Sequence, residues 1–172
     1  CDVTPHHLFF NDSVLNSFNT NFKVKPPIRS EDDRKALVKG IKDGIIDAIA
    51  RDHAPHLDTE KNTTFKKAEF GTIGLETLFN ASFTRLCGEE GISLPDLIAL
   101  ITCGPAKILN LDAGKIEEGK TANIAVIDTE EEQRIKREDF ISKSKNSAFI
   151  GQKLYGRVIC TISKGRLVYR SR

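Results

Sequence analysis

Apolar residues recur at three- and four-residue spacing through the first two thirds of the chain, the period of helices that pack one face on a core. The clearest case follows Ser30, which with Asp33 resembles a capping box in which Asp replaces the usual Glu. We predict a helix from there to Gly44, with acidic residues in its first turn, where they suit the positive end of the helix dipole. The other predicted helices cover 12–18, 72–86, 93–103 and 106–109, with a break at Gly104-Pro105.

Two short apolar runs in the same part of the chain predict strands. Residues 1–4 form the first run, with Pro5 as its stop, and residues 45–50 form the second. The second run is continuous and follows a helix, which is typical of a strand buried in a parallel sheet. Residues 6–10 are predicted to be a junction between elements.

The pattern changes after Leu111, where glycines separate short β-like runs. The predicted strands of this part cover 124–127, 158–162 and 167–169. Lys164-Gly165 predicts a hairpin turn between the last two of them. We therefore place a domain boundary near Leu111, between an α/β part at 1–111 and a small β domain segment at 112–172.

The composition is that of an ordinary globular chain of 172 residues, with 39% hydrophobic and 29% charged residues. The net charge of +2 gives no electrostatic case for nucleic acid or an anionic membrane as a partner. The four cysteines form no C-x-x-C pair, so we expect free thiols and a cytoplasmic location. Because the first residue is Cys1 rather than Met, we expect the chain to be a fragment of a longer protein.

Residues with ionisable side chains lie directly after the second predicted strand, in the run Arg51-Asp52-His53-Ala54-Pro55-His56. A helix, a buried strand and then such residues form the pattern of a barrel or an open α/β sheet. Pro55 fixes its own φ and disfavours helix at Ala54, so the chain leaves the strand in a stiff turn. Asp52 could there bind a metal and move a proton, with a surface salt bridge as the alternative interpretation. His56 supplies a second polar group.

A resemblance to a known family rests on six segments, of which Asp52-His53-Ala54-Pro55-His56 is the most specific. The other five are Val3-Thr4-Pro5-His6-His7-Leu8, Pro26-Pro27-Ile28-Arg29, Gly71-Thr72-Ile73-Gly74-Leu75-Glu76-Thr77, Gly104-Pro105-Ala106-Lys107-Ile108 and the stretch from Gly114-Lys115-Ile116 through Ala122-Asn123-Ile124. Together they resemble the dihydroorotases of the amidohydrolase superfamily, in that family's order, and are similar to the class I enzymes of bacteria and archaea. The resemblance covers essentially the whole chain.

The resemblance implies a fold and a reaction. The expected fold is α/β: the carboxy-terminal portion of a (β/α)8 TIM barrel, its last two strands ending at Thr4 and Asp52, plus part of a small β-sandwich domain. The implied reaction is the reversible, zinc-dependent hydrolysis of dihydroorotate to N-carbamoyl-L-aspartate in pyrimidine biosynthesis. One or two zinc ions are expected, with most ligands upstream of this chain. Alone, the chain is expected to be inactive, because one carboxylate cannot hold catalytic zinc.

The resemblance also implies roles for individual residues. Asp52 matches the family's metal ligand and proton shuttle, and His56 matches a histidine that binds the substrate carboxylate. Backbone groups at Phe70 and Gly71 match those that contact the dihydropyrimidine ring. Lys25 stands where the family often has an Asn that contacts substrate, and this departure puts that contact in doubt.

Other candidates and departures leave alternatives open. On a strand, neighbouring His6 and His7 would point to opposite faces and could not easily share one ion. We expect His7 to lie nearer the site than His6, with packing as the alternative for both. His53 could touch the metal or satisfy a backbone carbonyl, and Arg29 could reach an anion or form a structural ion pair. The remaining departures from the family are Arg51 for Thr, Phe70 for Pro and Asn123 for Asp.

Two rival functions remain at this point. The first is another cyclic amidase, a hydantoinase or allantoinase, whose members usually carry different residues after the Asp. The second is a non-catalytic dihydroorotase-like partner of aspartate transcarbamoylase, against which Asp52 and His56 argue. For the leading hypothesis, the expected partners are the small-molecule substrate, the missing half of the barrel, and a second copy or aspartate transcarbamoylase.

Overall fold

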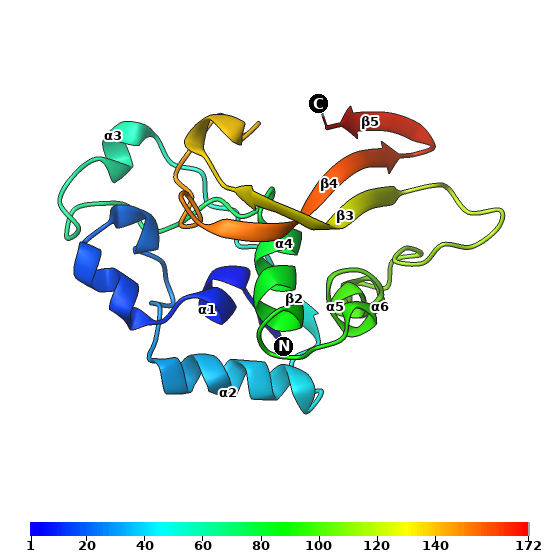
Figure 1. Ribbon diagram of the computed structural model, residues 1–172, viewed down its shortest axis with the longest axis horizontal. Helices are drawn as coiled ribbons and strands as arrows, with labels where there is room; N and C mark the ends of the chain where they lie inside the picture. Colours follow the sequence, from blue (N-terminus) through cyan, green and yellow to red (C-terminus); the bar gives the residue numbers. More distant parts are fainter. Residues whose placement is uncertain (172) are drawn as a thin grey trace.

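The computed structural model describes residues 1–171 and shows an α/β chain with two separate sheets (Figure 1). A parallel pair, β1 and β2, lies near the amino terminus, and an antiparallel sheet of order β3-β4-β5 forms the carboxy-terminal part. Helices α1 and α4 pack against each other between that sheet and helix α2. The strands are β1 (Asp2–Val3), β2 (Ala48–Ile49), β3 (Ile124–Arg134), β4 (Lys153–Ser163) and β5 (Arg166–Arg170).

The helices are short, apart from α2. They are α1 (Pro5–Phe9), α2 (Glu31–Lys42), α3 (Asp58–Lys61), α4 (Leu78–Ser82), α5 (Leu94–Ile101) and α6 (Cys103–Ile108). Shorter turns are the 3-10 helices η1 (Asp12–Ser17), η2 (Thr20–Phe22) and η4 (Arg137–Asp139) and the π-helical η3 (Phe83–Cys87). None of the helices in residues 1–171 combines the length and apolar composition needed to cross a membrane.

Helix α2 confirms the strongest helix prediction. The side chain of Ser30 accepts a hydrogen bond from the backbone N–H of Asp33 at 3.2 Å, as the capping pattern predicts. Val38 and Ile41 are buried, so the predicted apolar stripe does face the core. The helix ends just before Gly44, whose φ of +70° is the left-handed conformation common after a helix end.

The amino-terminal prediction was wrong at Pro5. This residue begins helix α1 instead of only ending a strand, because proline lacks an N–H that the first helical turn would leave unpaired. Residues 6–9 therefore belong to a helix and not to a junction, so His6 and His7 are helical neighbours. The predicted helix after Asn11 is present as η1, a 3-10 helix whose first turn is capped by the Asn11 side chain.

Two helix boundaries also differ from the prediction. The helix expected from residue 72 begins only at Leu78, because the segment before it pairs with other chain segments: Thr72 O accepts from Ala54 N at 3.0 Å. The expected break at Gly104-Pro105 lies at Thr102 instead, and Pro105 sits in the first turn of α6.

Strands β1 and β2 confirm the predicted parallel pair, although each is shorter than its apolar run. Asp2 pairs with Ala48 and Val3 pairs with Ile49. Because the strands are parallel, their carboxyl ends lie at one edge. The segments that follow, which carry Thr4 and the turn at 52–56, therefore leave the pair on the same side.

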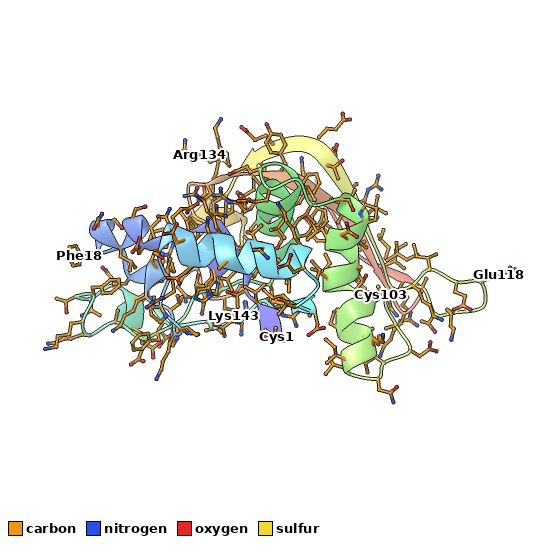
Figure 2. All side chains as sticks on the ribbon, turned by 90° about the horizontal axis from the view of Figure 1, so that it is seen from below. Cys1, Phe18, Cys103, Glu118, Arg134 and Lys143 are labelled. Carbon is orange, nitrogen blue, oxygen red and sulfur yellow. The ribbon has the colours of Figure 1, made fainter. Side chains whose placement is uncertain are left out.

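The carboxy-terminal sheet confirms the three predicted strands and the hairpin between the last two, and each strand is longer than expected. The hairpin turn between β4 and β5 is at Lys164-Gly165, where both residues have positive φ, as such turns require. Before β3, residues 112–123 form a loop that extends away from the rest of the chain (Figure 1). Figure 2 places Glu118 at the far end of this loop.

Two hydrophobic clusters hold the elements together. One is rich in aromatic residues and joins Phe9 and Phe10 of the α1 region to Phe149 and Leu154 near β4. The other is mostly aliphatic and joins Val3, Leu8, Ile49, Leu86 and Leu97 around the parallel pair. Residues on both sides of Leu111 thus share the first cluster, and the domain boundary near Leu111 stays a prediction.

Candidate active site

Asp52 lies two residues beyond the Ala50 that follows β2, and it is exposed. Its φ of +44° places it in the left-handed region, which Asp tolerates better than most residues and which is common at functional sites. Within residues 1–171 its carboxylate forms no ion pair, so the salt-bridge alternative is not realised there. Both carboxylate oxygens are therefore available to a ligand.

Asp52 fits a metal only as one member of a larger donor set. In residues 1–171, no group of three or more His, Cys, Asp or Glu side chains is placed to hold an ion. A catalytic zinc site needs about three protein ligands. The donor chemistry of Asp52 suits zinc, but residues 1–171 do not complete a three-ligand site around it.

His56 is oriented by the loop opposite it. Its Nε2 lies 2.9 Å from the carbonyl oxygen of Phe70, so Nε2 carries a proton and donates it. Its Nδ1 is 3.5 Å from a carboxylate oxygen of Glu60. The side chain is 22% exposed, and Nδ1 is the nitrogen left to meet an anion. A substrate carboxylate at Nδ1 would compete with Glu60.

The backbone of Gly71 is already engaged inside the protein. Its N–H donates to Lys23 O at 2.8 Å, and its carbonyl accepts from Lys61 Nζ at 2.9 Å and from Asn146 Nδ2 at 3.4 Å. The Phe70 carbonyl is taken by His56, whereas the Phe70 N–H has no partner within residues 1–171. Of the predicted backbone contacts, the Phe70 N–H is thus the group free to bind a ligand.

Glycine is required at position 71 for steric reasons. Its φ is +137°, and a Cβ there would lie 2.5 Å from the Cβ of Ala54 and 3.0 Å from Nε2 of His56. Real Cβ atoms do not approach so closely. The turn at 52–56 and the loop at residues 70–71 can therefore pack this closely only because residue 71 has no side chain.

Two lysines that the sequence analysis did not single out hold this loop. Lys61 is only 5% exposed and donates to the carbonyls of Glu69 and Gly71 at 2.8 and 2.9 Å. Burial, together with the nearby charge of Lys23, lowers the pKa of Lys61 to about 8 from an ordinary 10.5. Lys23 donates to two further loop carbonyls, and its Nζ lies 4.4 Å from the centroid of the Phe70 ring. Nothing in their local sequence distinguishes them from surface lysines.

His6 and His7 form one hydrogen-bonded chain through Thr4. His7 Nε2 lies 3.0 Å from Pro26 O and must donate, so its Nδ1 accepts from the Thr4 hydroxyl at 2.7 Å. The same hydroxyl oxygen then accepts from His6 Nε2 at 3.0 Å. Burial, and secondly His7, lowers the pKa of His6 to about 3. The expectation that the rings point to opposite faces was wrong, and neither nitrogen of His7 is free for a metal.

The structure places the remaining candidates away from direct chemistry. His53 Nδ1 accepts from the backbone N–H groups of Gly74 and Leu75 at 3.2 and 3.4 Å, so it satisfies amides and not the carbonyl that we expected. Arg29 forms an exposed ion pair with Asp33 at 3.4 Å, the structural alternative. Lys25 is exposed and forms no hydrogen bond or ion pair within residues 1–171.

The candidate site is an open surface, since Asp52, Lys25 and Phe70 are exposed. A cleft of about 870 Å³ exists elsewhere, between the α4 region and the carboxy-terminal sheet. It is lined by residues such as Phe79, Ile135 and Tyr169, and none of the predicted site residues borders it.

The family model for the amidohydrolase family matches residues 7–168, nearly the whole chain. The chain belongs to the amidohydrolase family. Relatives in this family include a dihydroorotase of Lactobacillus gasseri, 44% identical over 172 residues, and one of Clostridium acetobutylicum, 43% identical over 171 residues. Each alignment covers 99% of this chain and 40% of the relative, so this amidohydrolase chain spans about 40% of the length of these curated relatives.

Solved structures agree with the family assignment. The L-hydantoinase (dihydropyrimidinase) of Arthrobacter aurescens superposes with a TM-score of 0.92 at 26% identity, over 99% of this chain and 39% of that one. The dihydropyrimidinase of Brevibacillus agri gives a TM-score of 0.89 at 22% identity, over 98% and 39%. The second likeness shows the fold alone.

Proposed function

We propose that this chain is part of a dihydroorotase, a cyclic amidohydrolase that interconverts dihydroorotate and N-carbamoyl-L-aspartate in pyrimidine biosynthesis. The observation that carries the proposal is the turn at 52–56, with a free Asp52 carboxylate at the end of β2 and His56 held against the loop at Phe70. The 44% identity to a dihydroorotase, against 26% to a hydantoinase, supports this substrate class.

The finer fold proposal is that β1 and β2 are the last two strands of a (β/α)8 barrel. Their parallel pairing and the TM-score of 0.92 with L-hydantoinase support it. Two strands cannot close a barrel. By full-length protein we mean the whole polypeptide that contains this chain. The rest of that protein would supply the remaining strands, most of the metal ligands and the cover over this open surface.

In the proposed mechanism, Asp52 is the residue that moves the proton. A bound zinc would be held partly by Asp52 and would supply Lewis acidity and a water that ionises near neutral pH. Asp52 accepts a proton from the attacking water and returns it to the ring nitrogen as the ring C–N bond breaks. Its carboxylate suits both duties because no neighbouring side chain of residues 1–171 occupies it.

Substrate binding is assigned to the opposite loop. His56 can bind the substrate carboxylate on the Nδ1 side of its ring, and the N–H of Phe70 can donate to a ring carbonyl. Lys25, exposed and without an ion-pair partner within residues 1–171, could pair with the same carboxylate in place of the Asn common in the family.

The test is turnover by the full-length protein with dihydroorotate, hydantoin and dihydrouracil. We expect hydrolysis of dihydroorotate, and we expect Asp52→Asn to lower kcat by about 10²–10⁴-fold, the usual contribution of a positioned acid–base group. Asp43→Asn is the control, because Asp43 is also exposed but lies at the end of α2. The 172-residue chain alone is expected to show no turnover.

Each alternative has its own outcome. Preferred turnover of hydantoin or dihydrouracil would move the assignment to another cyclic amidase, whose solved members share this fold. Absence of turnover with all three substrates, in a folded full-length protein loaded with zinc, would favour a non-catalytic partner of aspartate transcarbamoylase.

A further inference from the structure

Asn146 joins two loops of the candidate site although it lies 75 to 92 residues away from them in the sequence. It is located between η4 and β4 and is 3% exposed. Its Oδ1 accepts from the His56 N–H at 3.1 Å, and its Nδ2 donates to the Ala54 carbonyl at 2.9 Å and to the Gly71 carbonyl at 3.4 Å. One side chain therefore binds both the turn at 52–56 and the loop at 70–71.

The backbone around Asn146 reinforces the same connection. Its carbonyl accepts from the Ile73 N–H at 3.0 Å and from the Thr72 hydroxyl at 3.1 Å. The Thr72 oxygen in turn accepts from the Ala148 N–H at 2.8 Å. Residues 146–148 thus lie along residues 71–73, and the Asn146 side chain continues that contact to the turn.

The pattern of donors and acceptors requires an amide at this position. The oxygen end faces an N–H, and the nitrogen end faces two carbonyls, so the orientation of the amide is determined by its partners. An aspartate would place an anionic oxygen against those carbonyls, and an apolar side chain would leave buried groups unpaired. Only an amide satisfies these partners together.

Lys61 also contacts the Gly71 carbonyl, but its role is different. Its Nζ bonds only to Glu69 and Gly71, which belong to the same loop. Asn146 is the side chain that bonds both to this loop and to the turn. The separation of the loop and the turn also sets the 2.9 Å bond from His56 Nε2 to Phe70 O, which orients the ring.

We propose that Asn146 is a positioning residue of the substrate site: it sets the distance between the turn at 52–56 and the loop at 70–71, and so aims the imidazole of His56 at the substrate carboxylate. This proposal rests on the proposed dihydroorotase function. In this role Asn146 acts through His56 and not by contact with the substrate.

The experiment uses the full-length zinc-loaded protein and the variant Asn146→Asp, with Asn16→Asp as the control. The control makes the same chemical change at an exposed residue of η1. We expect KM for dihydroorotate to rise by about tenfold or more, with kcat changed less than about threefold. For the methyl ester of dihydroorotate, which lacks the carboxylate, kcat/KM should change little.

A double-variant cycle separates positioning from general stability. If Asn146 acts through His56, Asn146→Asp should not raise KM further when His56 is already replaced by Asn. Additive effects in that cycle, or equal losses with the acid and the ester, would overturn the proposal. Asn146→Ser, smaller and uncharged, is measured in the same way should Asn146→Asp give no soluble protein.

Failure of the underlying function has a different signature. A wild-type protein that does not turn over dihydroorotate would contradict the proposed function before any variant is compared. An active wild type with an unchanged KM in Asn146→Asp would contradict only the positioning role.

Discussion

The candidate site and the carboxy-terminal sheet are held together in opposite ways. In the sheet, β4 and β5 are joined by a turn and pair through an antiparallel ladder of backbone hydrogen bonds. At the site, hydrogen bonds of the Asn146 and Thr72 side chains join residues that are 74 to 92 positions apart. The sheet needs few particular side chains, whereas the site depends on individual buried ones.

Burial shows the same difference. Thr72, Asn146 and Lys61 are polar and almost fully buried, so each must keep its partners in the fold. On β5, every residue is exposed, including Leu167 and Tyr169. A substitution at the site therefore leaves unpaired groups behind, whereas one on β5 changes mainly the surface.

The largest expected effect comes from Gly71→Ala compared with Gly165→Ala. Both glycines have positive φ, but only at Gly71 would a Cβ meet another atom, the Cβ of Ala54 at 2.5 Å. We expect Gly71→Ala to lower the free energy of unfolding by about 3 kcal/mol or more and Gly165→Ala by about 1 kcal/mol. Urea unfolding of the full-length protein measures both. Equal decreases in the free energy of unfolding would show that the positive φ, and not the close approach of Ala54, determines the cost of the substitution.

A smaller effect is expected for Thr72→Val compared with Thr161→Val. The Thr72 hydroxyl is fully buried and hydrogen-bonds to Asn146 O and Ala148 N, so its removal leaves the buried Ala148 N–H without a partner. We expect Thr72→Val to lower the free energy of unfolding by about 1–3 kcal/mol. At half-buried Thr161 on β4, where valine suits a strand, we expect that free energy to change by no more than about 0.5 kcal/mol. Thermal unfolding checks the pair, and similar values for the two variants would contradict the comparison.

Lys61 is expected to make the free energy of unfolding depend on pH. Its pKa is about 8 in the folded chain against an ordinary 10.5. Below pH 8 both states are protonated and the folded state bears the full cost of the buried charge. Between pH 8 and 10.5 that cost disappears, so this contribution makes the free energy of unfolding rise with pH across that window. The free energy of unfolding of Lys61→Met, measured over the same pH range, should lack this rise. A Lys61→Met protein that retains it would contradict the assignment.

Local features of the sequence predicted several elements well. The Ser30 cap places the start of α2, and the hairpin at Lys164-Gly165 follows from Gly165, a residue suited to positive φ. The predictions were wrong where other segments compete for the backbone. The apolar spacing that starts at Leu75 favours a helix, yet backbone groups of residues 72–74 pair with the turn at 52–56 and with Asn146.

The sequence by itself determined the candidate site: the stiff turn at 52–56 after a buried strand, with Asp52 at its start. It could not identify Asn146, Lys61 or Thr4 as the groups that orient the site. Capping, turn formation and apolar periodicity depend on neighbours within a few residues, so they can be read locally. The partners of a buried polar side chain are decided only when distant segments pack together, because burial removes water and leaves those segments as the sole source of hydrogen bonds.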